Sequence, residues 1–243
     1  GTEELLVGRN RPLDTLLVGT AGDTPDTLAV LQEFAAPLLA QPPVQPRHLS
    51  AGRPIRCSGN SRSRNLTSFQ NRLAAEALGS FFLFATVVGS GIMAESLSGG
   101  NVAVALIGNT LATGAMLFVL ITMFGPISGA HFNPAVSLVM RLRGDSSWLE
   151  LLAIMAVQLI AGILGVWAAH LMFDLPVLQL SHHGRTGPGQ WLGEFIATFG
   201  LLLTIIGTVR HRPDAVPASV ALYITAAYWF TSSTSFANPA ITI

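Results

Sequence analysis

The chain has 243 residues, of which half are apolar and 11% are charged, whereas roughly a quarter of the residues in a soluble domain are charged. Its net charge is zero, it contains no lysine, and it has no basic face with interleaved aromatic residues, which excludes a nucleic-acid-binding protein. A single cysteine, Cys57, excludes a disulfide framework within one chain. The mean hydropathy of +0.54 instead indicates a membrane protein.

Residues 1–71 hold half of the charged residues in less than a third of the chain, and we interpret them as a polar, disordered N-terminal segment with no readable function. Within it, only residues 24–40 are suited to a short amphipathic helix. The run CSGNSRSR at 57–64 resembles the Cys-x5-Arg phosphate loop of small tyrosine phosphatases and arsenate reductases, but Ser63 stands where the arginine belongs. We interpret this run as a chance match and keep a reductase-type enzyme here as an alternative only.

From Leu73 onward, five apolar runs approach the roughly 17 to 25 residues that a helix needs to cross the hydrocarbon core. They cover residues 73–94, 102–124, 149–172, 190–209 and 217–233. Five such runs in series predict a protein that crosses the membrane several times. Arginines gather before the first and third runs and between the fourth and fifth, which predicts a cytoplasmic N-terminus in a plasma or inner membrane.

The first and fourth runs resemble each other, with Glu76 aligned to Glu194, Ser80 to Thr198 and Phe81 to Phe199. An offset of three spans places equivalent segments in the membrane with opposite orientation. The sequence therefore predicts an inverted repeat, which places a site near the membrane midplane between the two halves.

Each half also contains the tripeptide Asn-Pro-Ala, at Asn133-Pro134-Ala135 and at Asn238-Pro239-Ala240. Asparagine is a strong N-cap and proline is favoured at the first helical position, so each tripeptide predicts the start of a helix. The first such helix, residues 133–141, is about 13 Å long, or half a bilayer. Two half-helices would meet N-terminus to N-terminus, where their positive ends repel cations and the asparagine amides offer donors to a neutral solute.

Three further polar residues lie close to these loops. We expect Glu76 and Glu194 to accept hydrogen bonds from backbone N–H groups of the loops; the alternative is a carboxyl that only reaches to the membrane surface. His131 precedes the first tripeptide, and we expect it to anchor the loop rather than to bind a metal, since no second ligand has suitable spacing.

The segments SGAHFNPAVSL and SFANPAIT, with the repeated glutamate motif, resemble the aquaporin and aquaglyceroporin (major intrinsic protein) family over residues 72–243. The resemblance implies an all-α, inverted-repeat bundle of six spans and two re-entrant half-helices. It also implies a homotetramer with one pore per subunit, no enzymatic activity and no cofactor or metal.

The same resemblance implies a narrow selectivity filter at Thr113, Ala226, Ser235 and Ile241. Water-selective members of the family have arginine at the position of Ile241, so we expect a wider and less polar pore here. The run AYWFTSSTSFANPAIT at 227–242 further resembles a bacterial branch associated with arsenic resistance. On that resemblance, the expected solutes are glycerol, neutral arsenite or methylated arsenicals, and water.

The sequence ends at Ile243, soon after the second tripeptide, so we expect a C-terminally truncated channel domain (72–243) whose sixth span is missing and whose pore wall is open on one side. Two alternatives remain at this point. One is a secondary transporter, since these proteins also use inverted repeats and broken helices. The other is a membrane fragment that does not conduct.

Overall fold

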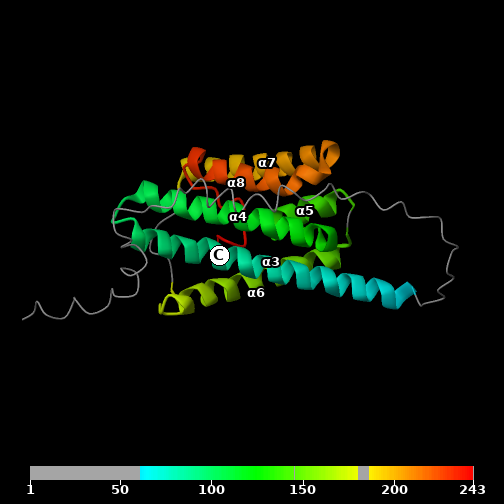
Figure 1. The fold of residues 1–243 in the computed structure, drawn as a ribbon. Coiled ribbons are helices and arrows are strands. Elements are labelled where there is room, and N and C mark those ends of the chain that lie inside the picture. Colours follow the sequence, from blue (N-terminus) through cyan, green and yellow to red (C-terminus); the bar gives the residue numbers. More distant parts are fainter. Residues whose placement is uncertain (1–60, 145, 180–185, 243) are drawn as a thin grey trace, which may run out of the picture. The chain divides into compact units, whose positions relative to one another are not determined.

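The computed structural model describes residues 61–144, 146–179 and 186–242, and within these ranges the chain is all-helical, with no strand. The chain divides into two compact units, Gly1–Cys57 and Ser58–Ile243, and only the second contains described residues. Figure 1 shows its helices. They are α3 (Ser61–Leu97), α4 (Val102–Ser128), α5 (Pro134–Leu142), α6 (Trp148–Met172), α7 (Pro188–His211), the 3-10 helix η1 (Pro213–Ala215) and α8 (Val216–Phe230).

The long helices pack as a series of neighbours, in the order α6, α3, α4, α8 and α7, and the short helix α5 contacts both α6 and α7 (Figure 1). Glycines allow the closest approaches. A Cβ on Gly165 of α6 would lie 2.2 Å from the carbonyl oxygen of Phe81 on α3, so no side chain fits there. Small residues at such crossings bring helix backbones together, which is how helices associate in a membrane.

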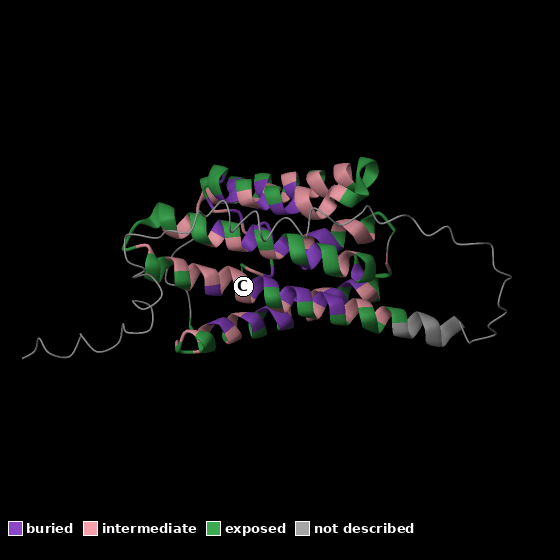
Figure 2. Cartoon of the chain, in the orientation of Figure 1, coloured by how far each residue is buried: buried purple, intermediate pink, exposed green. Residues whose placement is uncertain are grey.

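Four helices are long and apolar enough to cross a membrane: residues 68–97 of α3 and the whole of α4, α6 and α7. In the first three, only 33% of the most apolar window is buried, and in α7 only 17%. Most of each apolar surface therefore faces outward, and buried residues are confined to the inner sides of the helices (Figure 2). Helices that are apolar all round belong in lipid, so the multi-pass membrane architecture is confirmed.

The structure differs from the sequence-based expectations at two places. The predicted fifth span, 217–233, is a helix of 15 residues that ends at Phe230, because Thr231 adopts extended backbone (φ −104°, ψ 139°). At 1.5 Å per residue this helix is about 22 Å long, shorter than the hydrocarbon core.

The second difference lies at the N-terminal boundary. Residues 61–71, which the sequence assigned to the disordered segment, form the first turns of α3. Hydropathy identifies where a helix enters the membrane and does not detect a polar extension of that helix. The predicted helix at 24–40 and the run beginning at Cys57 up to residue 60 lie outside the described residues.

Candidate channel site

Two loops with the same unusual backbone meet inside the bundle. Ala130 and Phe132, three residues and one residue before Asn133, have φ values of 51° and 48°. Ser235 and Ala237 hold the same places before Asn238, with φ values of 52° and 45°. Left-handed backbone at residues other than glycine costs about 1 to 3 kcal/mol each, and such strain persists only where the surroundings enforce it. The repeat therefore extends to the backbone conformation of the loops.

Each asparagine caps the turn that follows it. Asn133 Oδ1 accepts a hydrogen bond from the backbone N–H of Ala135 at 2.9 Å, and α5 then begins at Pro134 and runs for nine residues. Asn238 Oδ1 accepts from Ala240 N–H at 3.1 Å. A single turn follows within the described residues, closed by a bond from Ile241 N–H to the Asn238 carbonyl. The predicted first half-helix is present with its predicted cap.

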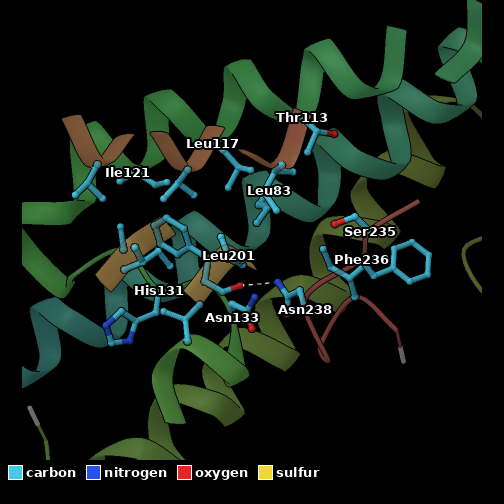
Figure 3. A pocket seen from close by; sticks show the side chains of 18 of the residues that line it. Leu83, Thr113, Leu117, Ile121, His131, Asn133, Leu201, Ser235, Phe236 and Asn238 are labelled. Carbon is cyan, nitrogen blue, oxygen red and sulfur yellow. Dashed lines mark hydrogen bonds between the residues drawn. The ribbon is translucent and has the colours of Figure 1, made fainter. Parts of the chain in front are cut away.

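The two asparagines also bind the opposite loops to each other. Asn133 Nδ2 donates to the carbonyl of Ala237 at 2.6 Å. Asn238 Nδ2 donates to the carbonyl of Phe132 at 2.8 Å, the bond that is drawn as a dashed line in Figure 3. Both acceptor carbonyls belong to left-handed residues, so the unusual backbone turns them toward the other loop. Each amide nitrogen carries two hydrogens, and the second remains for another acceptor.

The first loop is held by a fully buried carboxylate, that of Glu76 on α3. Its Oε1 accepts from Ser128 Oγ at 2.6 Å and from His131 N–H at 2.9 Å. Its Oε2 accepts from Phe132 N–H at 2.8 Å and from Gln158 Nε2 at 2.8 Å. Four donors satisfy a buried charge that would otherwise be very unfavourable.

Glu194 on α7 holds the second loop in the same manner. Its two oxygens accept from the backbone N–H groups of Phe236 and Ala237 at 2.9 Å and 2.7 Å. Both carboxylates thus bind the residues immediately before the asparagines, and neither lines the central cavity described below. Their charge is used to hold loop backbone.

His131 belongs to the same network as Glu76. Its Nδ1 lies 3.1 Å from Ser137 Oγ on α5, and that hydroxyl also accepts from Gln158 Nε2 at 3.0 Å. The histidine thus contacts the half-helix on one side while its backbone N–H binds Glu76 on the other. Sequence reasoning missed Gln158, although an amide in the middle of an apolar span is a recognisable signal for a buried polar contact.

A cavity of about 260 Å³ lies beside the meeting point of the loops (Figure 3). Most of its wall is aliphatic. Its polar side chains are those of Thr113, His131, Asn133, Tyr228, Ser235 and Asn238, and no Asp, Glu, Lys or Arg is among the described residues that line it. A polar strip on an apolar wall suits a small uncharged molecule with hydroxyl groups.

Three of the four filter residues expected from the resemblance line this cavity, namely Thr113, Ser235 and Ile241. Ala226 does not: it is exposed, and Tyr228 lies at the cavity instead, with its hydroxyl 3.4 Å from Thr113 Oγ1. Two positions along a helix differ by about 200° in direction, so Ala226 and Tyr228 face different sides of α8. An aromatic ring therefore lines the cavity two residues beyond the alanine that the resemblance implied.

A helical membrane bundle whose cavity lies where two capped, charge-free loops meet is a protein of the channel class. The sequence profile of the family described as Major intrinsic protein matches residues 63–243, and the chain belongs to this family of membrane channels for small solutes. The family predicted from the sequence is thereby confirmed.

Individual relatives agree with that assignment. An aquaglyceroporin AqpS of Rhizobium meliloti (strain 1021) is 56% identical over 172 residues, which are 71% of this chain and 73% of the relative. An aquaporin Z of Photorhabdus laumondii is 29% identical over 62% of this chain and 71% of the relative. The lens fiber major intrinsic protein of Gallus gallus is 32% identical over 66% of this chain and 62% of its own length.

Proposed function

We propose that the protein is a passive channel for small uncharged solutes with several hydroxyl groups, such as glycerol and neutral arsenite or methylated arsenicals, together with water. The observation that carries this proposal is a cavity whose described lining has polar groups but no Asp, Glu, Lys or Arg. An ion entering such a cavity would lose its hydration without receiving a counter-charge, whereas a polyol exchanges water for amide and hydroxyl partners. The name aquaglyceroporin of the 56% identical relative supports the same class of solute.

The narrow part of the channel consists of Thr113, Tyr228, Ser235 and Ile241. Ser235 Oγ is buried, has no hydrogen-bond partner among the described residues and lines the cavity, so it can donate to or accept from a passing hydroxyl. Ile241 places an aliphatic side chain where water-selective relatives have arginine, and the ring of Tyr228 limits the width on the opposite helix. The filter that we propose is free of arginine and bounded by an aromatic ring.

The hydrogen bonds of the two membrane carboxylates, and their position outside the cavity lining, favour a channel over a secondary transporter. Coupled transport requires ionisable groups that exchange protons or ions with the path of the solute. Glu76 accepts four hydrogen bonds and Glu194 accepts two from loop backbone, and neither lines the cavity. We therefore propose that the flux is not coupled to an ion gradient.

The placement of the protein in the cell belongs to the same proposal. The arginine distribution supports a cytoplasmic N-terminus in a plasma or inner membrane. The outward-facing apolar helices support association of channel subunits within the bilayer, as the homotetramer of the family implies.

The experiment is stopped-flow light scattering on proteoliposomes that contain the 243-residue chain, under gradients of glycerol, neutral arsenite or an impermeant osmolyte that reports water. We expect entry of both solutes to be faster than in empty vesicles and unaffected by a proton gradient. Ile241→Arg should suppress solute entry more than water flow. Entry no faster than in empty vesicles would refute the proposal.

The position of the filter is tested by a matched pair of variants on α8. Tyr228→Ala should widen the path and speed glycerol entry, whereas Ala226→Leu should leave it unchanged because Ala226 is exposed and outside the cavity lining. A block by Ala226→Leu with no effect of Tyr228→Ala would show that Ala226, and not Tyr228, lines the channel.

A further inference from the structure

A shallow, open groove of about 470 Å³ lies on the surface of the bundle at the junction of α7, η1 and α8. It is lined by Thr204, Gly207, Thr208 and His211 of α7, by Arg212 and by Ser219 of α8, among others. None of its lining residues lines the channel cavity, which uses Leu201, Ile205 and Val209 on another side of α7.

The groove changes character along α7. Toward the middle of the helix it is lined by Leu203, Thr204 and Gly207: Leu203 is 61% exposed, and a Cβ placed on Gly207 would meet nothing within 4 Å. Toward the C-terminal end of the helix it is lined by His211 and Arg212. A membrane-length helix ends at His211, so the apolar part lies at the depth of acyl chains and the cationic part at the depth of head groups.

Three hydroxyl groups line the groove, and they differ in whether they already make a hydrogen bond. Thr204 Oγ1 donates to the carbonyl of Gly200 at 2.8 Å, whereas the hydroxyls of Thr208 and Ser219 make no hydrogen bond in the described part of the chain. Arg212 contacts Asp214 at 3.8 Å, but both side chains are about three-quarters exposed (75% and 76%). An exposed pair of this kind contributes little and leaves the guanidinium able to bind another anion.

The balance of charge at this end of α7 stays positive. The last turn of a helix carries about half a negative charge, and Asp214 adds one more. Arg210 and Arg212 contribute two positive charges. These basic side chains therefore do more than neutralise the end of the helix.

We propose that this groove binds an anionic phospholipid, with its phosphate at Arg212, His211, Thr208 and Ser219 and an acyl chain along Gly207. A phosphodiester offers the acceptor oxygens that guanidinium and hydroxyl groups recognise, and the attached chain fills the apolar part of the groove. Basic pockets between membrane helices at the cytoplasmic surface recognise anionic head groups in this way. The inference concerns a surface apart from the channel and holds whether or not the channel conducts.

The first test removes the charge. The full chain is purified from nanodiscs that contain equal amounts of phosphatidylglycerol and phosphatidylcholine, and the retained lipid is counted by native mass spectrometry. We expect wild type to retain phosphatidylglycerol in preference to phosphatidylcholine. Arg212→Gln should weaken retention about five-fold, the equivalent of about 1 kcal/mol for one basic residue at the surface. Arg143→Gln removes another exposed arginine, outside the groove, and should have no such effect.

The second test fills the groove and leaves every charge in place. Gly207→Leu should be tolerated, because nothing lies within 4 Å of the new Cβ, yet its side chain would occupy the path of the acyl chain. Gly189→Leu is the matched control, since Gly189 is also on α7 and its Cβ would also meet nothing within 4 Å. We expect loss of retained phosphatidylglycerol in the first variant only.

Four outcomes would overturn the proposal. Equal retention in Arg212→Gln and Arg143→Gln would show attraction by overall charge alone. Unchanged retention in Gly207→Leu would show that no acyl chain uses the groove. Displacement of the lipid by millimolar inorganic phosphate would show that the site recognises a free anion. An oligomer that retains no lipid would show that another copy of the chain covers the groove.

Discussion

Replacing Glu76 by glutamine tests whether the buried carboxylate holds the first loop. Each oxygen of Glu76 accepts two hydrogen bonds, and glutamine turns one of these oxygens into a donor. Two bonds to a charged group are then lost, at about 1.5 to 3 kcal/mol each, so the free energy of unfolding should fall by about 3 to 6 kcal/mol. The two former donors are also left facing an N–H₂ group, which places the effect toward the upper end.

Glu194→Gln provides the internal comparison. Each oxygen of Glu194 accepts one bond, so glutamine loses a single bond and should cost about 1.5 to 3 kcal/mol, less any part that water replaces at this partly exposed site. Both values are measured by denaturant unfolding in mixed micelles, with Glu95→Gln at an exposed position as the control. Solute entry into vesicles should fall in the same order. Equal losses for the two variants would contradict the reasoning, because they would show that the number of accepted hydrogen bonds does not set the contribution.

Two other predictions concern the loop contact and the helix crossing. Asn133→Ala removes a helix cap and leaves the Ala237 carbonyl without its donor, so unfolding in micelles should become easier by about 2 to 4 kcal/mol; an unchanged midpoint would show that the cross-loop bond contributes nothing. Gly165→Ala should cost about 1 to 3 kcal/mol, because its Cβ would collide with the Phe81 carbonyl, while Gly125→Ala, with nothing within 4 Å, should stabilise α4 by about 0.5 to 1 kcal/mol. The same thermal scan distinguishes the signs of the two glycine variants.

Much of the fold follows from local patterns, which is why the sequence predicted it. The apolar runs 102–124, 149–172 and 190–209 correspond to α4, α6 and α7 within a few residues at each end. Hydropathy is a reliable guide because lipid requires a long, uniformly apolar helix. The start of α5 is equally local, since asparagine and proline define the first turn of a helix without help from the rest of the protein.

The parts of the site that the sequence did not predict depend on contacts between distant segments. The left-handed backbone at Phe132 and Ala237 has no composition signal, because neither residue type favours that conformation. It is enforced by bonds from Glu76, Glu194 and the opposite asparagine, which are far away in the chain. The position of Tyr228 at the cavity likewise depends on how residues 231–237 lead from α8 into the loop, and no motif in the sequence fixes that path.

The internal repeat predicts where the two carboxylates act but not how strongly each one acts. Glu76 and Glu194 occupy equivalent places in the two halves. Each accepts hydrogen bonds from the backbone N–H groups of the two residues that precede the asparagine of its loop. Only Glu76 also binds side chains, Ser128 and Gln158, among the described residues. Through Gln158 and Ser137 this first site connects α3, α6 and α5, whereas the second loop is held by α7 and by the reciprocal asparagine bonds. Among the described residues, the carboxylate of the first loop therefore joins more helices than that of the second, while both loops share the reciprocal asparagine bonds.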